Sequence, residues 1–236
     1  MPAAGNDFVC HYCLGPVTNY PQCWGCHELF QRVHKSGDDF LMVPGELTDT
    51  FVPMSTALKP SPWYTYLLQY KNGLLDAYGP ILAAVAYTFL SEHEDDIAAL
   101  LGGPPTCVTV VPSTRGFSHA EQPLVKALSL IAPLKEQLEY TLDHVPGSSV
   151  DRWHYNPAAF AAGPTSVEDE RILLVEDAWI TGATPISAAG ALLRDGAASV
   201  AIVALARVVN EGFLSDPKHP YRQGMEVLYD PAAWPR

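Results

Sequence analysis

Apolar positions are densest between residues 172 and 206, where two short apolar runs flank a helical repeat. Residues 172–175 are all apolar, which predicts a central strand buried on both faces. Apolar and small side chains then recur at helical spacing over residues 186–193, and Asp195-Gly196 is a typical helix end. Residues 200–206 are again apolar. The pattern predicts a strand, a helix and a second strand, as in a parallel sheet.

The remaining apolar patterns are shorter, and they alternate between strand and helix along the chain. Lys71-Asn72-Gly73 combines a cation with a glycine, which is typical of a helix end. Tyr66, Tyr70 and Tyr87 lie within apolar helix patterns, so we interpret them as packing residues. The expected elements are strands at 50–55, 107–111 and 137–142, and helices at 63–70, 74–90 with an interruption near Gly79-Pro80, 94–101 and 119–131.

The composition is that of a globular protein. Of the 236 residues, 48% are apolar and 17% are charged, so the chain can form one large domain, or one domain with a small module. The longest apolar stretches, such as residues 81–90, are too short to cross a bilayer. The N-terminus shows no basic start followed by an apolar run. We therefore expect a cytoplasmic protein that has no membrane partner.

The charge balance is strongly acidic. Lysine and arginine number 14 against 26 aspartates and glutamates, which gives a formal net charge of −12. A surface of this sign repels nucleic acid unless a local basic patch is present, and the sequence contains no basic run. A nucleic-acid partner is therefore not expected.

Four of the five cysteines form two Cys-x2-Cys pairs near the N-terminus: Cys10, Cys13, Cys23 and Cys26. Two such pairs supply the four thiolates of a tetrahedral structural zinc site. A pair of disulfides is the alternative, which a cytoplasmic location disfavours. A redox-active pair is another, although neither pair lies in a thioredoxin-like strand–helix setting. We predict a zinc module over residues 1–36 and a second domain over 37–236, and we expect loss of Cys23 to destabilise the module alone.

Polar residues with a defined chemistry follow the first apolar run. Glu176 and Asp177 come first, and Thr181-Gly182-Ala183-Thr184 precedes the helix, with Thr184 expected as its N-cap and Pro185 as its first residue. Backbone N–H groups in such a turn, beside a helix N-terminus, are well placed to bind phosphate. Two adjacent carboxylates suit the vicinal hydroxyls of a ribose or a hydrated Mg²⁺. Together these groups indicate a phosphorylated sugar as the ligand.

The whole stretch 172–184 resembles the phosphoribosyl pyrophosphate (PRPP) signature of type I phosphoribosyltransferases, which is an apolar run, two acids, a spacer and Thr-Gly-Ala-Thr. The resemblance implies a Rossmann-like α/β fold with a mainly parallel sheet flanked by helices. It also implies Mg²⁺ bound together with PRPP, and Asp177 as the catalytic carboxylate. Trp179-Ile180 departs from the family pattern, in which smaller or hydroxylated residues are common, and Pro185 lacks a backbone donor.

Two other segments gain a meaning from this resemblance. Ser113-Thr114-Arg115-Gly116 follows the strand predicted at 107–111, and taken alone it is most simply a surface turn with a solvated arginine. Beside a PRPP signature it resembles the pyrophosphate loop of the family. Residues 143–164 resemble in position the hood that closes over PRPP. The expected substrate contacts are therefore Ser113, Thr114, Arg115, Gly116, Glu176, Asp177, Thr181, Gly182, Ala183 and Thr184.

The order of these features resembles the competence ComF family over residues 10–207, because a four-cysteine module, a helix containing Tyr-Lys and an Arg-Gly-Phe turn precede the signature. The resemblance implies one of two functions. An enzyme would transfer ribose 5-phosphate from PRPP to an unidentified nitrogen nucleophile and release pyrophosphate. A non-catalytic protein would bind PRPP or assist DNA uptake. A homodimer is compatible with both functions. An acceptor pocket would favour the enzyme, and a basic surface stripe would favour the accessory protein.

Overall fold

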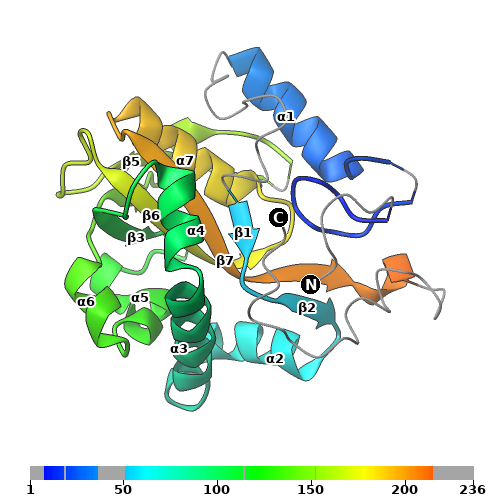
Figure 1. Cartoon of the computed structure of the whole chain (residues 1–236), viewed down its shortest axis with the longest axis horizontal. Helices are drawn as coiled ribbons and strands as arrows, with labels where there is room; N and C mark the ends of the chain where they lie inside the picture. Colours follow the sequence, from blue (N-terminus) through cyan, green and yellow to red (C-terminus); the bar gives the residue numbers. More distant parts are fainter. Residues whose placement is uncertain (1–7, 19, 37–50, 114, 152, 215–236) are drawn as a thin grey trace.

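A parallel sheet forms the centre of the computed structural model, which describes residues 8–18, 20–36, 51–113, 115–151 and 153–214 (Figure 1). The strands follow the order β1–β7–β6–β3, and β2 pairs with β7 beyond the end of β1. All of these pairings are parallel. The strands are β1 (Phe51–Pro53), β2 (Thr56–Lys59), β3 (Cys107–Val110), β6 (Arg171–Trp179) and β7 (Ser199–Asn210).

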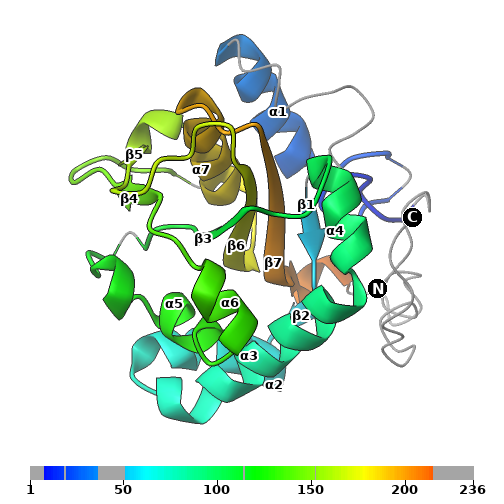
Figure 2. The ribbon, with the colours of Figure 1, turned by 60° about the vertical axis from the view of Figure 1, so that its left-hand side comes forward.

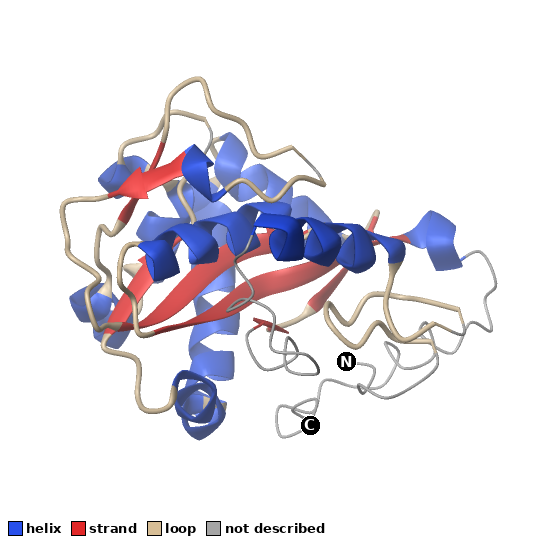
Figure 3. Ribbon diagram, turned by 90° about the horizontal axis from the view of Figure 1, so that it is seen from above, coloured by secondary structure: helices blue, strands red, loops and turns tan. Residues whose placement is uncertain are grey.

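Helices cover both faces of this sheet (Figures 2 and 3). Along β6, Ile172 and Leu174 belong to one hydrophobic cluster and Leu173 and Val175 to the other, as the alternation of a strand requires. The predicted fold class, a mainly parallel sheet flanked by helices, is confirmed. Helices α1 (Trp24–Ser36) and α7 (Ala183–Arg194) contribute to the first cluster, and α2 (Pro62–Gln69), α3 (Leu75–Glu92), α4 (Glu94–Leu101), α5 (Pro123–Leu128) and α6 (Ala132–Gln137) surround the second.

The strand before the acids is longer than predicted. β6 continues through Glu176 and Asp177 to Trp179, because Ala178 and Trp179 remain paired with β7. Trp179 is buried and stacks on the ring of Phe51, with 3.6 Å between the ring centroids. The two acids therefore lie on a rigid strand, where their backbone is fixed by the sheet.

Helix α7 starts two residues earlier than predicted. Its N-cap is Gly182 and not Thr184, and Pro185 is its third residue and not its first. Gly182 has a φ of +89°, which favours a residue without a Cβ. Pro185 is tolerated there because the first N–H groups of a helix have no partner within the helix. The helix ends at Arg194 with Asp195 as its C-cap, and Gly196 follows in the left-handed region, so the predicted Asp195-Gly196 helix end is confirmed.

Other predicted boundaries also change. α3 is continuous through Pro80, its sixth residue, and the ring removes one helical hydrogen bond, the one to the carbonyl of Asp76. The helix predicted at 119–131 is divided, because Pro123 starts α5 as a separate helix. Gln137 ends α6, and the next strand is β4 (Leu142–His144), which pairs antiparallel with β5 (Phe160–Ala162). Thr50, predicted as a strand residue, lies outside the described residues.

The three tyrosines that were expected to pack do not behave alike. Tyr70 is fully buried, and Tyr66 stacks on Tyr78 with 4.7 Å between the ring centroids. Tyr87 is 54% exposed on α3, so its interpretation as a packing residue is wrong. Among the described helices, none is both long and apolar enough to cross a membrane.

Candidate functional site

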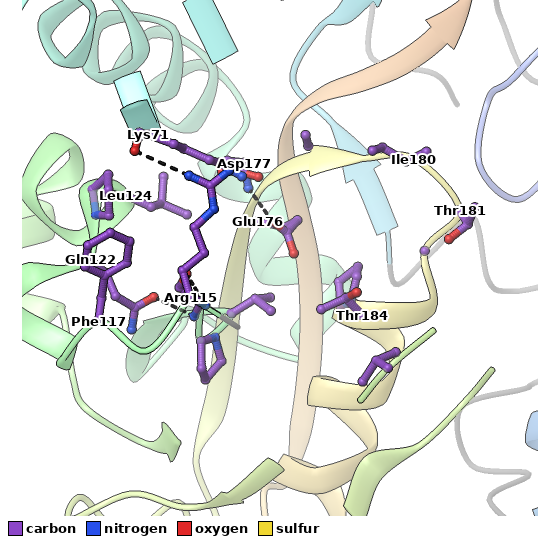
Figure 4. A pocket seen from close by; sticks show the side chains of 18 of the residues that line it. Lys71, Arg115, Phe117, Gln122, Leu124, Glu176, Asp177, Ile180, Thr181 and Thr184 are labelled. Atoms are coloured by element: carbon purple, nitrogen blue, oxygen red, sulfur yellow. Dashed lines mark hydrogen bonds and ion pairs between the residues drawn. The ribbon is translucent and has the colours of Figure 1, made fainter. Parts of the chain in front are cut away.

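A pocket of about 520 Å³ opens where β3 and β6 end, at the carboxyl edge of the sheet (Figure 4). In open parallel sheets this edge is where ligands bind. Gly116 and Ala183 do not line the pocket themselves, but each lies between two residues of the chain that do. Thr114 lies outside the described residues. Seven of the predicted substrate contacts line the pocket: Ser113, Arg115, Glu176, Asp177, Thr181, Gly182 and Thr184.

The wall formed by residues 181–184 has the geometry of an anion cradle. Gly182 takes the left-handed conformation and its carbonyl accepts the first helical bond, from Ile186, at 3.0 Å. The N–H groups of Ala183 and Thr184 lie in the first turn of α7, where no carbonyl precedes them within the helix. These donors, together with the positive end of the helix dipole, favour a bound phosphate.

The two acids occupy different electrostatic environments. Asp177 is buried, accepts a hydrogen bond from the hydroxyl of Tyr70 and forms an ion pair with the ammonium of Lys71. Burial alone would raise the pKa of Asp177, but the charge of Lys71 and these hydrogen bonds outweigh burial and lower the pKa. Burial and the neighbouring charge of Asp177 instead raise the pKa of Glu176 well above its ordinary value. Asp177 is therefore the ionised member of the pair, and Glu176 holds its proton more tightly.

Arg115 lies on the opposite side of the pocket from the cradle (Figure 4). Its guanidinium donates to Asn72 Oδ1 at 3.0 Å and to the carbonyl oxygen of Lys71 at 3.5 Å. The turn below it is held by Gln122, whose Oε1 accepts from the backbone N–H of Ser113 at 3.0 Å. This arrangement places one arginine and one lysine at the same end of the pocket.

The sequence reasoning missed the role of the segment that follows α2. Tyr70, Lys71 and Asn72 form the 3-10 helix η3 and reach Asp177 and Arg115. The Tyr-Lys pair before a glycine was interpreted as a packing residue and a helix end. Packing does bury the ring of Tyr70, but its hydroxyl needs a buried partner, and that partner is Asp177.

The four N-terminal cysteines converge as predicted. The sulfur atoms of Cys10, Cys13, Cys23 and Cys26 all lie within 4.8 Å of one another, and none is in a disulfide. The Sγ atoms of Cys13 and Cys23 are 3.7 Å apart. Zn–S bonds of about 2.3 Å in a tetrahedron place sulfurs about 3.8 Å apart, so the four thiols fit a zinc ion. Hydrogen bonds within the cluster, Cys10 first, together with the charge of Arg207, hold the pKa of Cys13 well below its ordinary value.

Arg207 connects this cysteine cluster to Trp179 and Ile180, which lead into the anion cradle. It is 8% exposed, and its Nε donates to the carbonyl of Cys13 at 3.1 Å while Nη2 lies 3.5 Å from Cys13 Sγ. Its Nη1 donates to the carbonyls of Trp179 at 3.1 Å, Ile180 at 2.8 Å and Val208 at 2.7 Å. The sequence reasoning did not single it out. A lone cation within the apolar run of β7 was the available signal.

We expect one zinc ion per chain in the purified protein, and Cys23→Ser is expected to lose it because three thiolates leave the tetrahedral shell open. Elemental analysis of both proteins after removal of loosely bound metal measures this. Cys107→Ser is the control, since Cys107 is buried in β3 and is not part of the cluster. Wild-type protein with neither zinc nor iron would refute the metal site.

Comparison with known proteins yields structural neighbours only. No protein-family model matches the chain, and no curated protein sequence matches it. An alanine mutant made to analyse an invariant aspartic acid in HPRTs superimposes with a TM-score of 0.32 at 17% identity, over 52% of this chain and 75% of that chain. A mutant of hypoxanthine phosphoribosyltransferase from Trypanosoma cruzi, in a ternary complex with substrates, gives a TM-score of 0.30 at 14% identity. The match covers 52% of this chain and 77% of that chain.

Proposed function

We propose that this protein binds PRPP as a type I phosphoribosyltransferase and transfers its ribose 5-phosphate to a nitrogen nucleophile. One observation carries the proposal: a single pocket brings together the acids and the Thr-Gly-Ala-Thr turn of the PRPP signature with the distant Arg115 turn. Three subsites follow from their chemistry. The 5-phosphate binds the N–H groups of the cradle, the ribose hydroxyls donate to Glu176 and Asp177, and the pyrophosphate lies towards Arg115.

In the transfer step the bond between the acceptor nitrogen and C1 of the ribose forms, and the bond between C1 and the pyrophosphate oxygen breaks. The electron pair leaves with pyrophosphate, and the nitrogen loses a proton to solvent. Negative charge grows on the pyrophosphate, so the cation of Arg115 stabilises the transition state more than the ground state. Mg²⁺ bound with PRPP would supply further charge neutralisation at the phosphate oxygens. The carboxylate of Asp177 holds the ribose in the position of attack.

Lys71 has a defined place in this scheme. Its ammonium neutralises Asp177 in the free protein, and its backbone carbonyl contacts Arg115. Burial would lower the pKa of Lys71, but the charges of Asp177 and Glu176 outweigh it and raise the pKa. Lys71 therefore stays charged and lies between the ribose subsite and the pyrophosphate subsite. Once ribose hydroxyls occupy Asp177, the same ammonium is within the pocket that the pyrophosphate enters.

A non-catalytic PRPP-binding role is the second candidate, and one observation favours it. Between Asp177 and Thr181 the chain carries only Ala178, Trp179 and Ile180, so no side chain there can accept the proton of the acceptor nitrogen. Pyrophosphate release from PRPP and Mg²⁺, measured with and without nitrogen acceptors, separates the two candidates. If PRPP binds but no pyrophosphate is released under any of these conditions, the enzyme is refuted and the non-catalytic role is supported.

Arg115→Ala is expected to weaken PRPP binding about tenfold and to leave the affinity for ribose 5-phosphate unchanged, because only PRPP carries the pyrophosphate that Arg115 contacts. Calorimetric titration of both ligands into both proteins, with Mg²⁺ present, measures the contrast. Arg171→Ala is the control, since Arg171 bonds the carbonyl of Pro104 at the opposite edge of the sheet. Equal weakening of both ligands would place Arg115 in the scaffold and contradict the pyrophosphate subsite.

A further inference from the structure

A second pocket of about 570 Å³ lies behind residues 178–181, the segment that leads from the acids into the anion cradle. Ile180 and Thr181 line both pockets, so this segment is their common wall (Figure 4 shows its face towards the first pocket). Cys13, Cys23 and neighbouring residues of the cysteine module bound the second pocket on another side, as do the ends of β2 and β7. A molecule in the second pocket is therefore separated from the ribose subsite by the common wall and takes no part in the transfer.

Aromatic side chains from separate segments of the chain line this second pocket: Tyr20, Trp24, Tyr64 and Trp153. Trp24 is 62% exposed although its ring contacts that of Trp153, with 4.9 Å between the ring centroids. Gly25 permits this contact, because a Cβ there would lie 2.8 Å from the ring of Trp153. A pocket of several hundred cubic ångströms that is walled by aromatic side chains is typical of a site for a small molecule.

The charges of the second pocket favour an anion. Lys59 Nζ lies 5.5 Å from the centre of the Tyr64 ring, and Asn210, which pairs with Lys59 in the sheet, also lines the pocket. Among the described lining residues there is no aspartate or glutamate, although the whole chain has a formal net charge of −12. The opposing charges are the thiolates of the cysteine module, and the guanidinium of Arg207 offsets them from 3.5 Å away at Cys13 Sγ. The second pocket therefore offers aromatic faces beside a cation.

Two segments contribute residues to both pockets. One is the common wall, where Ile180 is 50% exposed and its carbonyl accepts from Arg207 at 2.8 Å. The other is the connection between β4 and β5, where Asp151 lines the first pocket and Trp153 lines the second. These two residues are linked, because Asp151 Oδ1 accepts from the backbone N–H of Trp153 at 2.8 Å. A ligand that packs on Ile180 and Trp153 therefore restrains residues that line the proposed PRPP site.

We propose that the second pocket binds a regulatory ligand, a planar aromatic molecule with one anionic group, and that this ligand strengthens PRPP binding from behind the common wall. The regulatory part rests on the proposed function, whereas the binding site does not. The ring packs against Trp153 and Tyr64, and the anionic group lies towards Lys59. A common wall that one ligand already holds loses less freedom when the 5-phosphate binds to the cradle, so the two ligands favour each other.

The binding site is tested by calorimetric titration of 2-naphthoate and 2-naphthyl phosphate into the zinc-loaded full-length protein. Two probes are matched controls: 2-naphthylmethylamine has the same ring with the opposite charge, and cyclohexanecarboxylate has the negative charge without an aromatic ring. We expect at least one naphthyl anion to bind at least tenfold more tightly than either control, and the tighter of the two shows whether the pocket takes a carboxylate or a phosphate. Equal affinities of all four probes, or no binding of either naphthyl anion, would overturn the site.

Variants of the pocket separate the ring from the charge. Trp153→Ala and the exposed-site variant Lys59→Gln are each expected to weaken binding of the naphthyl anion about tenfold, through loss of a stacking face and of a charge-assisted contact. Trp153→Phe keeps a ring face and is expected to restore most of the affinity. Lys135→Gln changes an exposed lysine on α6 that lines neither pocket, and it is expected to have no effect. Wild-type affinity in both Trp153→Ala and Lys59→Gln would place the anion elsewhere and overturn the proposal.

The regulation is tested by titration of PRPP and Mg²⁺ with and without the saturating naphthyl anion. We expect PRPP to bind about fivefold more tightly when the second pocket is occupied, and the anion to gain the same factor from PRPP, because coupling is reciprocal. Equal or weaker PRPP binding in the presence of the anion would overturn the regulatory role. Wild-type protein that binds the anion but never PRPP would overturn the proposed function and leave the aromatic site supported.

Discussion

Gly182→Val is expected to lower the affinity for PRPP by about a thousandfold, a cost of about 4 kcal/mol. Gly182 has a φ of +89°, where a β-branched residue is strained by roughly 1–3 kcal/mol. A Cβ at this position would also collide with the indole ring of Trp179, which is fixed by its stacking on Phe51. The loop must therefore move, and the N–H groups that hold the 5-phosphate move with it. Calorimetry with PRPP and Mg²⁺ measures the loss.

The control for this variant is Gly102→Val. Gly102 also has a positive φ, of +74°, but a Cβ there would meet no atom within 4 Å, and Gly102 ends α4 away from both pockets. This substitution is expected to lower the thermal stability through backbone strain and to leave PRPP binding unchanged. Equal PRPP affinity of Gly182→Val and wild type, with both folded by circular dichroism, would show that the phosphate does not bind this loop.

The local strand–turn–helix unit could be predicted because several independent features of its sequence indicate the same structure. The apolar run, the two acids and the glycine turn each indicate the same order of elements, so only the boundaries shifted. Gly182 and not Thr184 is the N-cap, and its positive φ is a conformation that glycine adopts without steric cost. The length of β6 depended on the pairing of Ala178 and Trp179 with β7 and on the stacking of Trp179 on Phe51, which are contacts between segments distant in the sequence.

The partners of the acids could not be predicted from the sequence. Lys71 and Asp177 are 106 positions apart, and only the crossing of η3 over the end of β6 brings them together. The same is true of Arg115 and Asn72, which belong to different connections of the sheet. The spacing of a motif identifies residues that act together within one segment. Charged residues from distant segments, such as Lys71 and Asp177, can be paired only once the arrangement of the strands and helices is known.

Independence of the cysteine module was expected from its position in the sequence, and the contacts of Arg207 change this expectation. The guanidinium bonds the carbonyl of Cys13 on one side and the carbonyls of Trp179 and Ile180 on the other. Cysteine residues of the module also belong to the same hydrophobic cluster as Trp179 and Ala183. We therefore expect the metal site and the cradle to be coupled.

Arg207→Met is expected to lower the free energy of unfolding by about 3–5 kcal/mol, because it leaves several buried carbonyls without a donor. It is also expected to weaken PRPP binding and to speed the loss of zinc to a chelator, since both the Cys13 segment and residues 179–180 lose the same support. Denaturant unfolding, calorimetry and chelator kinetics measure the three effects. Arg171→Met, which removes an arginine at the other edge of the sheet, is the matched control.

Coupling through Arg207 is separated from general destabilisation by a double cycle of zinc removal and substitution. In wild type, removal of zinc is expected to weaken PRPP binding, and saturating PRPP is expected to slow zinc loss, because coupling between two sites is reciprocal. In Arg207→Met, zinc removal is expected to have little further effect on PRPP affinity, since the connection is already broken. Identical PRPP affinities of the zinc-loaded and zinc-free wild-type protein would show that the module and the cradle act independently, and that Arg207 serves the stability of the fold alone.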